Sequence, residues 1–318
     1  MYRKVLLGCR VIEAHLAGHY GNQYVLPRIG RQRNTMKPLT PSNKRPIVTL
    51  MTDFGLSDAY VGMMKGVIIG IVPRAHLIDL THDIPPQNVL SAAWILATAY
   101  RYFPQRTVHI CVVDPGVGSS RQAIALHAGD WFFVGPDNGL FSYILMEQTI
   151  QTAVNLSNSN YHLPQVSATF HGRDLFAPVG AHLARGASIN QLGTPIDPAT
   201  LQRLDIASPT RQETHIDAHI VHVDHFGNLI TTIPLTLVPD LFSNETSAQP
   251  LKLIFPTHNI VVERFNRFFS AGLDDGQPFI YNDSSGYLGI AIRNGNAAQA
   301  LNVIPGTPII FLTEHNDS

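Results

Sequence analysis

The sequence contains little cysteine and little charge. Only Cys9 and Cys111 occur among its 318 residues, so no disulfide framework is expected and a reducing cytoplasm fits. No apolar run approaches the roughly 18 residues of a membrane-spanning helix, so we expect no such helix. Charged residues make up 14% and hydrophobic residues 45% of the chain, a composition that favours a large buried core.

The two signs of charge are unevenly distributed. Residues 1–45 hold nine Lys and Arg residues and one Glu, a net of +8, so the remainder carries −9 of the overall −1. Nucleic-acid binding needs a basic face, and the acidic body therefore argues against nucleic acid as a partner. The apolar stretch near the start is shorter than an export signal needs. We expect residues 1–45 to form a disordered basic extension.

Several catalytic and metal-binding motifs are also missing. Phosphate loops read GxxxxGK[ST] or GxGxxG, whereas residues 116–121 read GVGSSR, without the lysine or the second glycine pair. Neither GxSxG nor HExxH occurs. Four histidines lie at 215–225 among β-branched residues, and on a strand His219 and His222 would point to opposite faces. We therefore predict no metal site.

The order of apolar segments predicts two domains. Strands alternate with helices up to about residue 190, which indicates a mostly parallel sheet. Residues 197–212 are Pro-rich and aperiodic, and short strands with little helix follow, as in a β-barrel or sandwich. We predict an α/β domain over 46–205 and an all-β domain over 212–318. The first strand is expected at 47–51, and Ser57 or Asp58 is expected to cap a helix over 59–71.

A ten-residue stretch, VVDPGVGSSR at 112–121, is a candidate ligand-binding site. It places Asp114 at the end of a strand expected over 107–113, and ligands bind at the carboxyl ends of strands in open α/β sheets. Glycines there let backbone N–H groups approach a ligand closely. Arg121 follows seven residues later. The alternative is a tight turn in which Asp114 bonds its own backbone.

Other polar residues lie in comparable positions. Asp53 follows the first strand and could bind the two hydroxyls of a ribose, or help to cap a helix. His171, next to Gly172, is a candidate base or water-orienting group, or a solvated loop residue. In the second domain, Asp224 and Asn228 could contact a ligand's polar edges, and Phe226 could stack on a flat base. A plain hairpin explains that segment equally well.

Eight short motifs occur together and in order: TDFG at 52–55, HDIPP at 82–86, DPGVGSSR at 114–121, PDNGL at 136–140, TFHGRDLFAP at 169–178, DHFGN at 224–228, SSGYL at 284–288 and GNAA at 295–298. In these motifs the chain resembles the S-adenosyl-L-methionine (SAM) hydrolases that form adenosine, also called SAM hydroxide adenosyltransferases. The resemblance covers about residues 46–315.

The resemblance implies an N-terminal α/β domain, a C-terminal β-barrel and a homotrimer whose sites lie between one subunit's first domain and a neighbour's barrel. It implies hydrolysis of SAM, as substrate, to adenosine and L-methionine without a cofactor or metal. Asp114, Arg121 and His171 would hold the attacking water. The implied substrate-binding residues are Asp53 for the ribose, Asp224 and Ser284 for the methionine end, Phe226, Asn228 and the backbone near Ile292 for adenine, and Asp58 and Tyr287 lining the pocket.

The family is related to fluorinase and chlorinase, which leaves halide-dependent adenosyl transfer as an alternative. The halogenases carry Tyr and Thr in a YPATG-like version of the DPGVG loop and lack the histidine found here at 171. A carboxylate at Asp114 would repel a halide but can accept a hydrogen bond from water. This contrast favours water as the nucleophile. A non-catalytic adenosine or SAM sensor is the alternative from another class.

Overall fold

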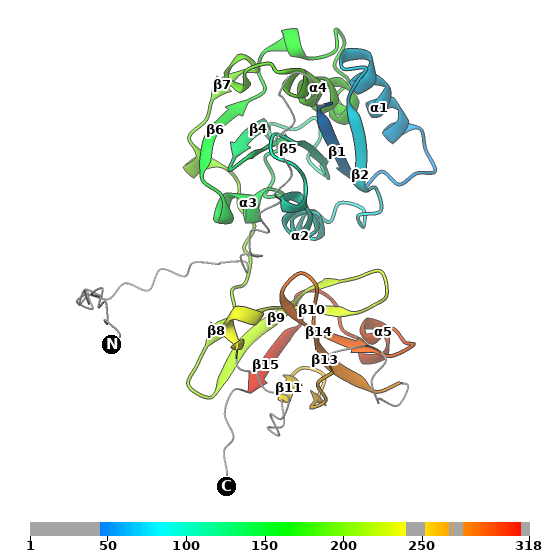
Figure 1. Ribbon diagram of the computed structural model, residues 1–318, viewed down its shortest axis with the longest axis vertical. Coiled ribbons are helices and arrows are strands. Elements are labelled where there is room, and N and C mark those ends of the chain that lie inside the picture. Colours follow the sequence, from blue (N-terminus) through cyan, green and yellow to red (C-terminus); the bar gives the residue numbers. More distant parts are fainter. Residues whose placement is uncertain (1–44, 240–251, 267–268, 270–275, 313–318) are drawn as a thin grey trace, which may run out of the picture.

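Figure 1 shows the protein as a computed structural model, which describes residues 45–239, 252–266, 269 and 276–312. The predicted basic extension lies outside the described residues, apart from Arg45. Within the described part, no helix combines the length and apolar composition needed to cross a membrane.

Seven strands form the first sheet, in the order β2-β1-β3-β5-β4-β6-β7. They are β1 (Ile47–Thr52), β2 (His76–Thr81), β3 (Val108–Val112), β4 (Ala123–Ala128), β5 (Trp131–Pro136), β6 (Ile150–Asn155) and β7 (Thr194–Pro195). The strands β2, β1, β3 and β5 run parallel, whereas β4 pairs antiparallel with β5 and β6. The predicted α/β class with a mostly parallel sheet is confirmed.

Helices cover both faces of this sheet (Figure 1). On one face lie α1 (Tyr60–Ile71) and α4 (Ala177–Arg185), and on the other α2 (Val89–Ala99) and α3 (Ser142–Glu147). The side chains around β3 alternate between the two: Ile110 and Val112 face α1 and α4, and Cys111 faces α2 and α3. A strand buried on both faces reads as a continuous apolar run. Because β3 is held in the core in this way, Asp114 has a fixed position just beyond its carboxyl end.

The remaining short helices connect these elements. They are 3₁₀ helices at Tyr100–Tyr102, Ser159–Tyr161, Ile189–Gln191, Pro198–Thr200 and Leu235–Leu237, and a π-helical turn, η4, at Gly172–Phe176.

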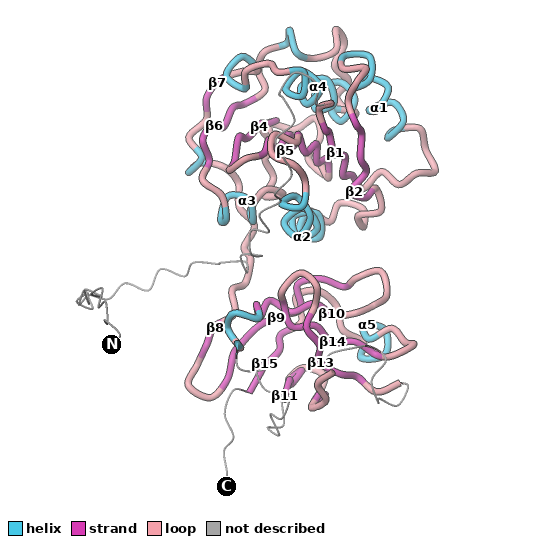
Figure 2. The backbone as a smooth tube through the Cα atoms, in the orientation of Figure 1, coloured by secondary structure: helices cyan, strands magenta, loops and turns pink. Residues whose placement is uncertain are grey.

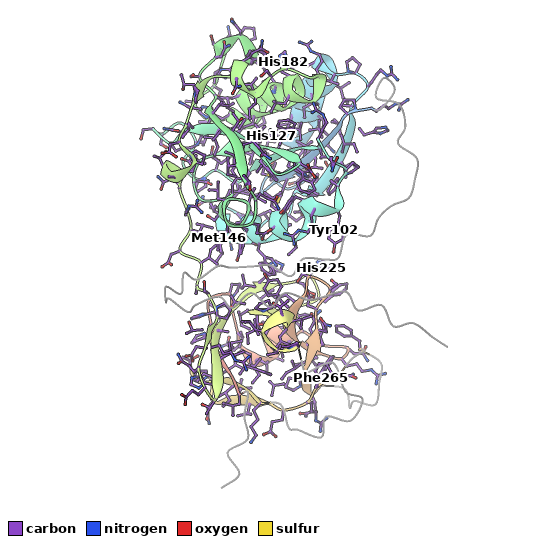
Figure 3. The ribbon with its side chains drawn as sticks, turned by 60° about the vertical axis from the view of Figure 1, so that its left-hand side comes forward. Tyr102, His127, Met146, His182, His225 and Phe265 are labelled. Atoms are coloured by element: carbon purple, nitrogen blue, oxygen red, sulfur yellow. The ribbon has the colours of Figure 1, made fainter. Side chains whose placement is uncertain are left out.

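The second domain is an antiparallel sheet that curls into a nearly closed barrel (Figure 2). Its strands are β8 (Thr210–Arg211), β9 (His215–Val223), β10 (Leu229–Pro234), β11 (Lys252–Phe255), β12 (Ile260–Val262), β13 (Pro278–Asn282), β14 (Tyr287–Ile292) and β15 (Pro308–Leu312), with α5 at Ala297–Leu301. Seven of them follow the order β12-β11-β15-β9-β10-β14-β13, and β8 pairs with β9 outside this order. Phe265, marked in Figure 3, bridges to Ile280 near the closure. The barrel is thus confirmed.

The two domains share an apolar cluster built around α2. Its Trp94 ring lies 4.9 Å from that of Tyr287, centre to centre, and both side chains are buried. Ala92 and Leu96, on another face of the same helix, pack against the first sheet. A helix covered on two sides is apolar around most of its circumference, which accounts for the sequence VLSAAWILATA.

Candidate active site

Asp114 lies two residues beyond β3, and its carboxylate is held by Arg121. Nε of Arg121 donates to both carboxylate oxygens, at 2.9 and 3.0 Å, and its Nη2 pairs with Oδ2. The two side chains are 5% and 10% exposed. Asn138 donates to the carbonyl of Val113 at 2.9 Å, which fixes the backbone just before the aspartate. A charge-assisted, two-point contact of this kind fixes the plane of the carboxylate.

His171 completes a three-residue cluster with Asp114 and Arg121. Its Nδ1 lies 2.8 Å from Nη2 of Arg121. Arginine can only donate, so Nδ1 accepts and the single proton of the neutral ring is on Nε2. Burial lowers the pKa of His171, and the charge of Arg121 lowers it further, against smaller opposing effects of Asp114 and Asp174. The predicted trio is therefore in contact, with His171 neutral.

The loop that carries Asp114 packs directly on the segment before His171. Gly118 has φ +79°, and a Cβ there would lie 2.6 Å from the carbonyl oxygen of Ala168. Both the backbone conformation and the space exclude a side chain. Ser119 donates to the carbonyl of Gly116 at 3.0 Å, closing the turn. Glycine therefore serves here to bring two distant segments together.

A buried carboxylate anchors the His171 segment from the other side. Asp174 is completely buried within η4, where it pairs with Arg173 and accepts from the backbone N–H of Ser167 at 2.8 Å. The guanidinium of Arg121 lies 5.4 Å from the ring centre of Phe176, at the end of the same turn. Sequence reasoning missed both Asp174 and Phe176. The one available signal was a charged pair at the start of an otherwise apolar helix.

Asp53 follows β1, and its Oδ2 accepts from the backbone N–H of Gln87 at 2.8 Å. Asp58 is exposed. The prediction that Ser57 or Asp58 caps the first helix is wrong, because the N-cap is Ala59 and no side chain caps it. Aromatic packing fixes this end instead: the ring of Tyr60 lies 5.2 Å from that of Phe170.

Three of the predicted barrel residues lie in one turn between β9 and β10. Oδ1 of Asp224 accepts from the backbone N–H groups of Phe226 and Asn228, at 2.9 and 2.8 Å, and Oδ2 accepts from the Asn228 amide at 2.8 Å. Phe226 is 73% exposed, whereas Asn228 is buried. Gly227, at φ +83°, packs against Asn296 at the start of α5. Figure 3 places His225 of this turn at the end of the barrel nearest the α/β domain.

The other predicted barrel residues have different surroundings. Ser284 is exposed in the turn between β13 and β14. Ile292 ends β14 and is 6% exposed, and Tyr287 is buried beside Trp94 of the same chain. The hydrogen bonds of Asp224 and Asn228 stay within their own turn.

Two sections of the chain match known domain families. Residues 48–193 match the SAM hydroxide adenosyltransferase N-terminal domain, and residues 218–310 match the C-terminal domain of the same name. The chain belongs to the SAM hydroxide adenosyltransferase family.

Named relatives agree with this assignment. The chain is 38% identical over 82% of its length to an (R)-S-adenosyl-L-methionine hydrolase of Salinispora tropica, covering 95% of that protein. It is 26% identical to a fluorinase of Actinoplanes sp., over 85% of this chain and 98% of that protein. A crystal structure of an uncharacterised conserved protein from Thermotoga maritima, 34% identical, superposes with a TM-score of 0.77 over 84% of this chain and 100% of that one. The predicted family is confirmed.

Among the residues that the structure describes, no three His, Cys, Asp or Glu side chains are grouped so that they could hold a metal ion. The histidines of β9 are His215, His219 and His222. Nε2 of His215 lies 3.4 Å from Oδ2 of Asp217.

Proposed function

We propose that this chain hydrolyses SAM to adenosine and L-methionine. The observation that carries the proposal is the contact between Asp114, Arg121 and His171 beyond a central parallel strand. It occurs in a chain whose relatives of 33–38% identity are named (R)-S-adenosyl-L-methionine hydrolases.

The chemistry of SAM explains why so small a cluster suffices. The sulfonium makes methionine a neutral leaving group, so sulfur needs no acid. What remains is to place one water in line with the C5′–S bond, about 3–3.5 Å from carbon, and to accept its proton as the C–O bond forms. The bonding electrons of C5′–S leave with methionine.

The position of the proton on His171 determines which side chain accepts the proton of water and which one orients the water. Because Nδ1 accepts from Arg121, the ring proton is on Nε2, where the ring can donate to water but cannot accept from it. Asp114 keeps carboxylate lone pairs beyond those used by Arg121. We therefore assign Asp114 as the proton acceptor and His171 as the group that orients the water. The negative charge of Asp114 also disfavours a halide in the same position.

The substrate-binding assignments belong to this proposal. Asp53 binds the ribose diol and Asp58 lines the pocket. The barrel supplies the other groups. Asp224 and Ser284 bind the methionine end, and Tyr287 lines the pocket. Adenine is contacted by Phe226, Asn228 and the backbone at Ile292.

We propose that the working unit is a homotrimer, in which the barrel of one subunit completes the site of its neighbour. Exposed apolar side chains support this: Phe226 is 73%, Leu56 67% and Tyr60 45% exposed. Leu56 lies in the loop after Asp53, and Phe226 beside Asp224, so each apolar surface adjoins predicted site residues. We also propose a cytoplasmic location, which the free, buried thiol of Cys111 supports.

The test is a SAM reaction in ¹⁸O-labelled water, followed by chromatography and mass spectrometry. We expect equal amounts of adenosine and methionine, with the label in the 5′-hydroxyl of adenosine. Asp114→Ala should lower kcat by about 10²-fold or more. Asp130→Ala, in the exposed turn between β4 and β5, should leave kcat unchanged. A 5′-halo-nucleoside formed in chloride or fluoride, or tight SAM binding without turnover, would contradict the proposal.

A further inference from the structure

The segment after β2, residues 82–88, folds over the loop that carries Asp53. Nδ1 of His82 lies 2.8 Å from Oγ1 of Thr52. Gly55 donates to the carbonyl of His82 at 2.9 Å, and Gln87 donates to Oδ2 of Asp53 at 2.8 Å. This segment contains the HDIPP motif, to which the site described above gives no role.

His82 is the buried link in this arrangement, at 3% exposure. Phe54 donates to Oγ1 of Thr52 at 3.2 Å, so the threonine hydroxyl proton is available for His82. On the other side, Nε2 of His82 lies 3.0 Å from Oδ1 of Asp79, close enough for an ion pair, although the two atoms do not meet the geometry of a hydrogen bond. Oδ2 of Asp79 accepts from Lys65 at 2.7 Å.

The charge of Asp79 fixes the tautomer of His82. Burial raises the pKa of the Asp79 carboxyl, but contacts with Lys65 and His82 outweigh it and hold that pKa below its usual value. An ionised carboxylate beside Nε2 keeps the ring proton on that nitrogen. Nδ1 is then an acceptor, so the hydroxyl of Thr52 donates the hydrogen bond between the two residues.

We propose that His82 is a positioning residue for Asp53. In this role it acts through other residues of the chain. It binds Thr52, the residue immediately before Asp53, and it begins the segment whose Gln87 N–H fixes the Asp53 carboxylate. Small displacements of a binding group cost much of its effect, so His82 sets how well Asp53 receives both ribose hydroxyls. This inference rests on the proposed function, because it uses the assignment of Asp53 to the ribose.

A residue that only stabilises the fold would weaken all ligands equally. A residue that positions Asp53 would weaken only ligands with a ribose diol. The experiment therefore compares the binding of adenosine and 2′-deoxyadenosine by calorimetry. The variants are His82→Asn, whose amide reaches the position of Nδ1, His82→Gln, whose amide reaches that of Nε2, and His82→Ala. Exposed His76, at the start of the preceding strand β2, provides the matched controls His76→Asn and His76→Gln.

We expect His82→Ala and His82→Gln to lose about tenfold in the preference for adenosine over 2′-deoxyadenosine, as for one hydrogen bond to a charged group. His82→Asn should retain that preference. For SAM hydrolysis, KM should rise by a similar factor while kcat stays nearly constant. Combined with Asp53→Ala, which removes the diol preference, His82→Ala should cause no further loss of preference.

An equal loss of affinity for both nucleosides in His82→Ala would overturn the inference, as would a wild-type preference in His82→Gln. If the alanine variant does not fold, the Asn and Gln variants decide the question alone. Wild-type protein that hydrolyses SAM without preferring adenosine overturns the role of Asp53 and this inference with it. Wild-type protein that prefers adenosine but does not hydrolyse SAM overturns the proposed function alone.

Discussion

The guanidinium of Arg121 determines the state of both side chains beside it. It holds the carboxylate of Asp114 by its Nε and Nη2 atoms, and its Nη2 also occupies Nδ1 of His171. A protonated imidazole would place an N–H against that cation. The same contact therefore orients His171 and keeps it neutral.

This arrangement predicts an acid limit of activity below the ordinary pKa of histidine. Burial and Arg121 both lower the pKa of His171, so lowering the pH protonates the ring only below about 6.5. We expect kcat/KM to stay constant from neutral pH down to about 6.5 and to fall only at lower pH. A pH profile measures this, with His171→Asn as the control that loses the limb. An acid limb centred at or above about 6.5 would contradict the prediction.

Sequence reasoning could select the residues of this cluster but not their contacts. Asp114 stands out because it ends an apolar run and precedes glycines. The contact between Arg121 and His171 spans 50 residues, and no local pattern encodes it. For the same reason, the sequence did not predict the burial of Asp174 or the hydrogen bond between His82 and Thr52. Each is a polar side chain whose partner lies on another element.

At the scale of elements, strand ends were easier to predict than helix starts. Because β1 and β3 are buried on both faces, their sequences are mostly apolar, and both strands stop close to Asp53 and Asp114. The start of α1 was placed too early because Ser57 and Asp58 are good capping residues. Contacts of Tyr60 with Phe54 and Phe170, at 5.9 and 5.2 Å, outweigh that local preference.

Substitution of Gly118 tests whether a steric clash in this loop affects catalysis beyond the effect of backbone strain alone. In Gly118→Ala, both the positive φ and the contact with Ala168 are unfavourable, so we expect a stability loss of about 1–3 kcal/mol and a clear loss of kcat. Gly186, the C-cap of α4, has φ +106° but open space around it. Gly186→Ala should lower the melting temperature with little effect on kcat.

Thermal unfolding and SAM turnover of the two variants test this together. The steric part is specific to Gly118, because its Cβ would push apart the loops that carry Asp114 and His171. Equal kcat values for Gly118→Ala and wild type would show that the contact with Ala168 does not set the geometry of the cluster.

At the scale of the whole molecule, α2 serves both domains. It packs on the first sheet through Leu96 and on the barrel through Trp94. The apolar sequence of a helix indicates that the helix is buried, but not that a second domain covers it. The exposed apolar residues that remain, Leu56 and Phe226 among them, belong to loops of different domains, and a neighbouring subunit can cover both.

The proposed trimer predicts complementation between inactive subunits. If each site combines one subunit's α/β domain with a neighbour's barrel, mixing Asp114→Ala with Phe226→Ala restores sites that carry neither change. Random assembly of equal amounts makes about a quarter of the sites intact, so we expect that share of wild-type activity at SAM concentrations well below KM. Asp114→Ala mixed with His171→Ala has both changes in one domain and should restore nothing. Subunits exchanged after mild denaturation, with size measured by light scattering, provide the assay. Mixed trimers that recover no activity would place each site within a single chain.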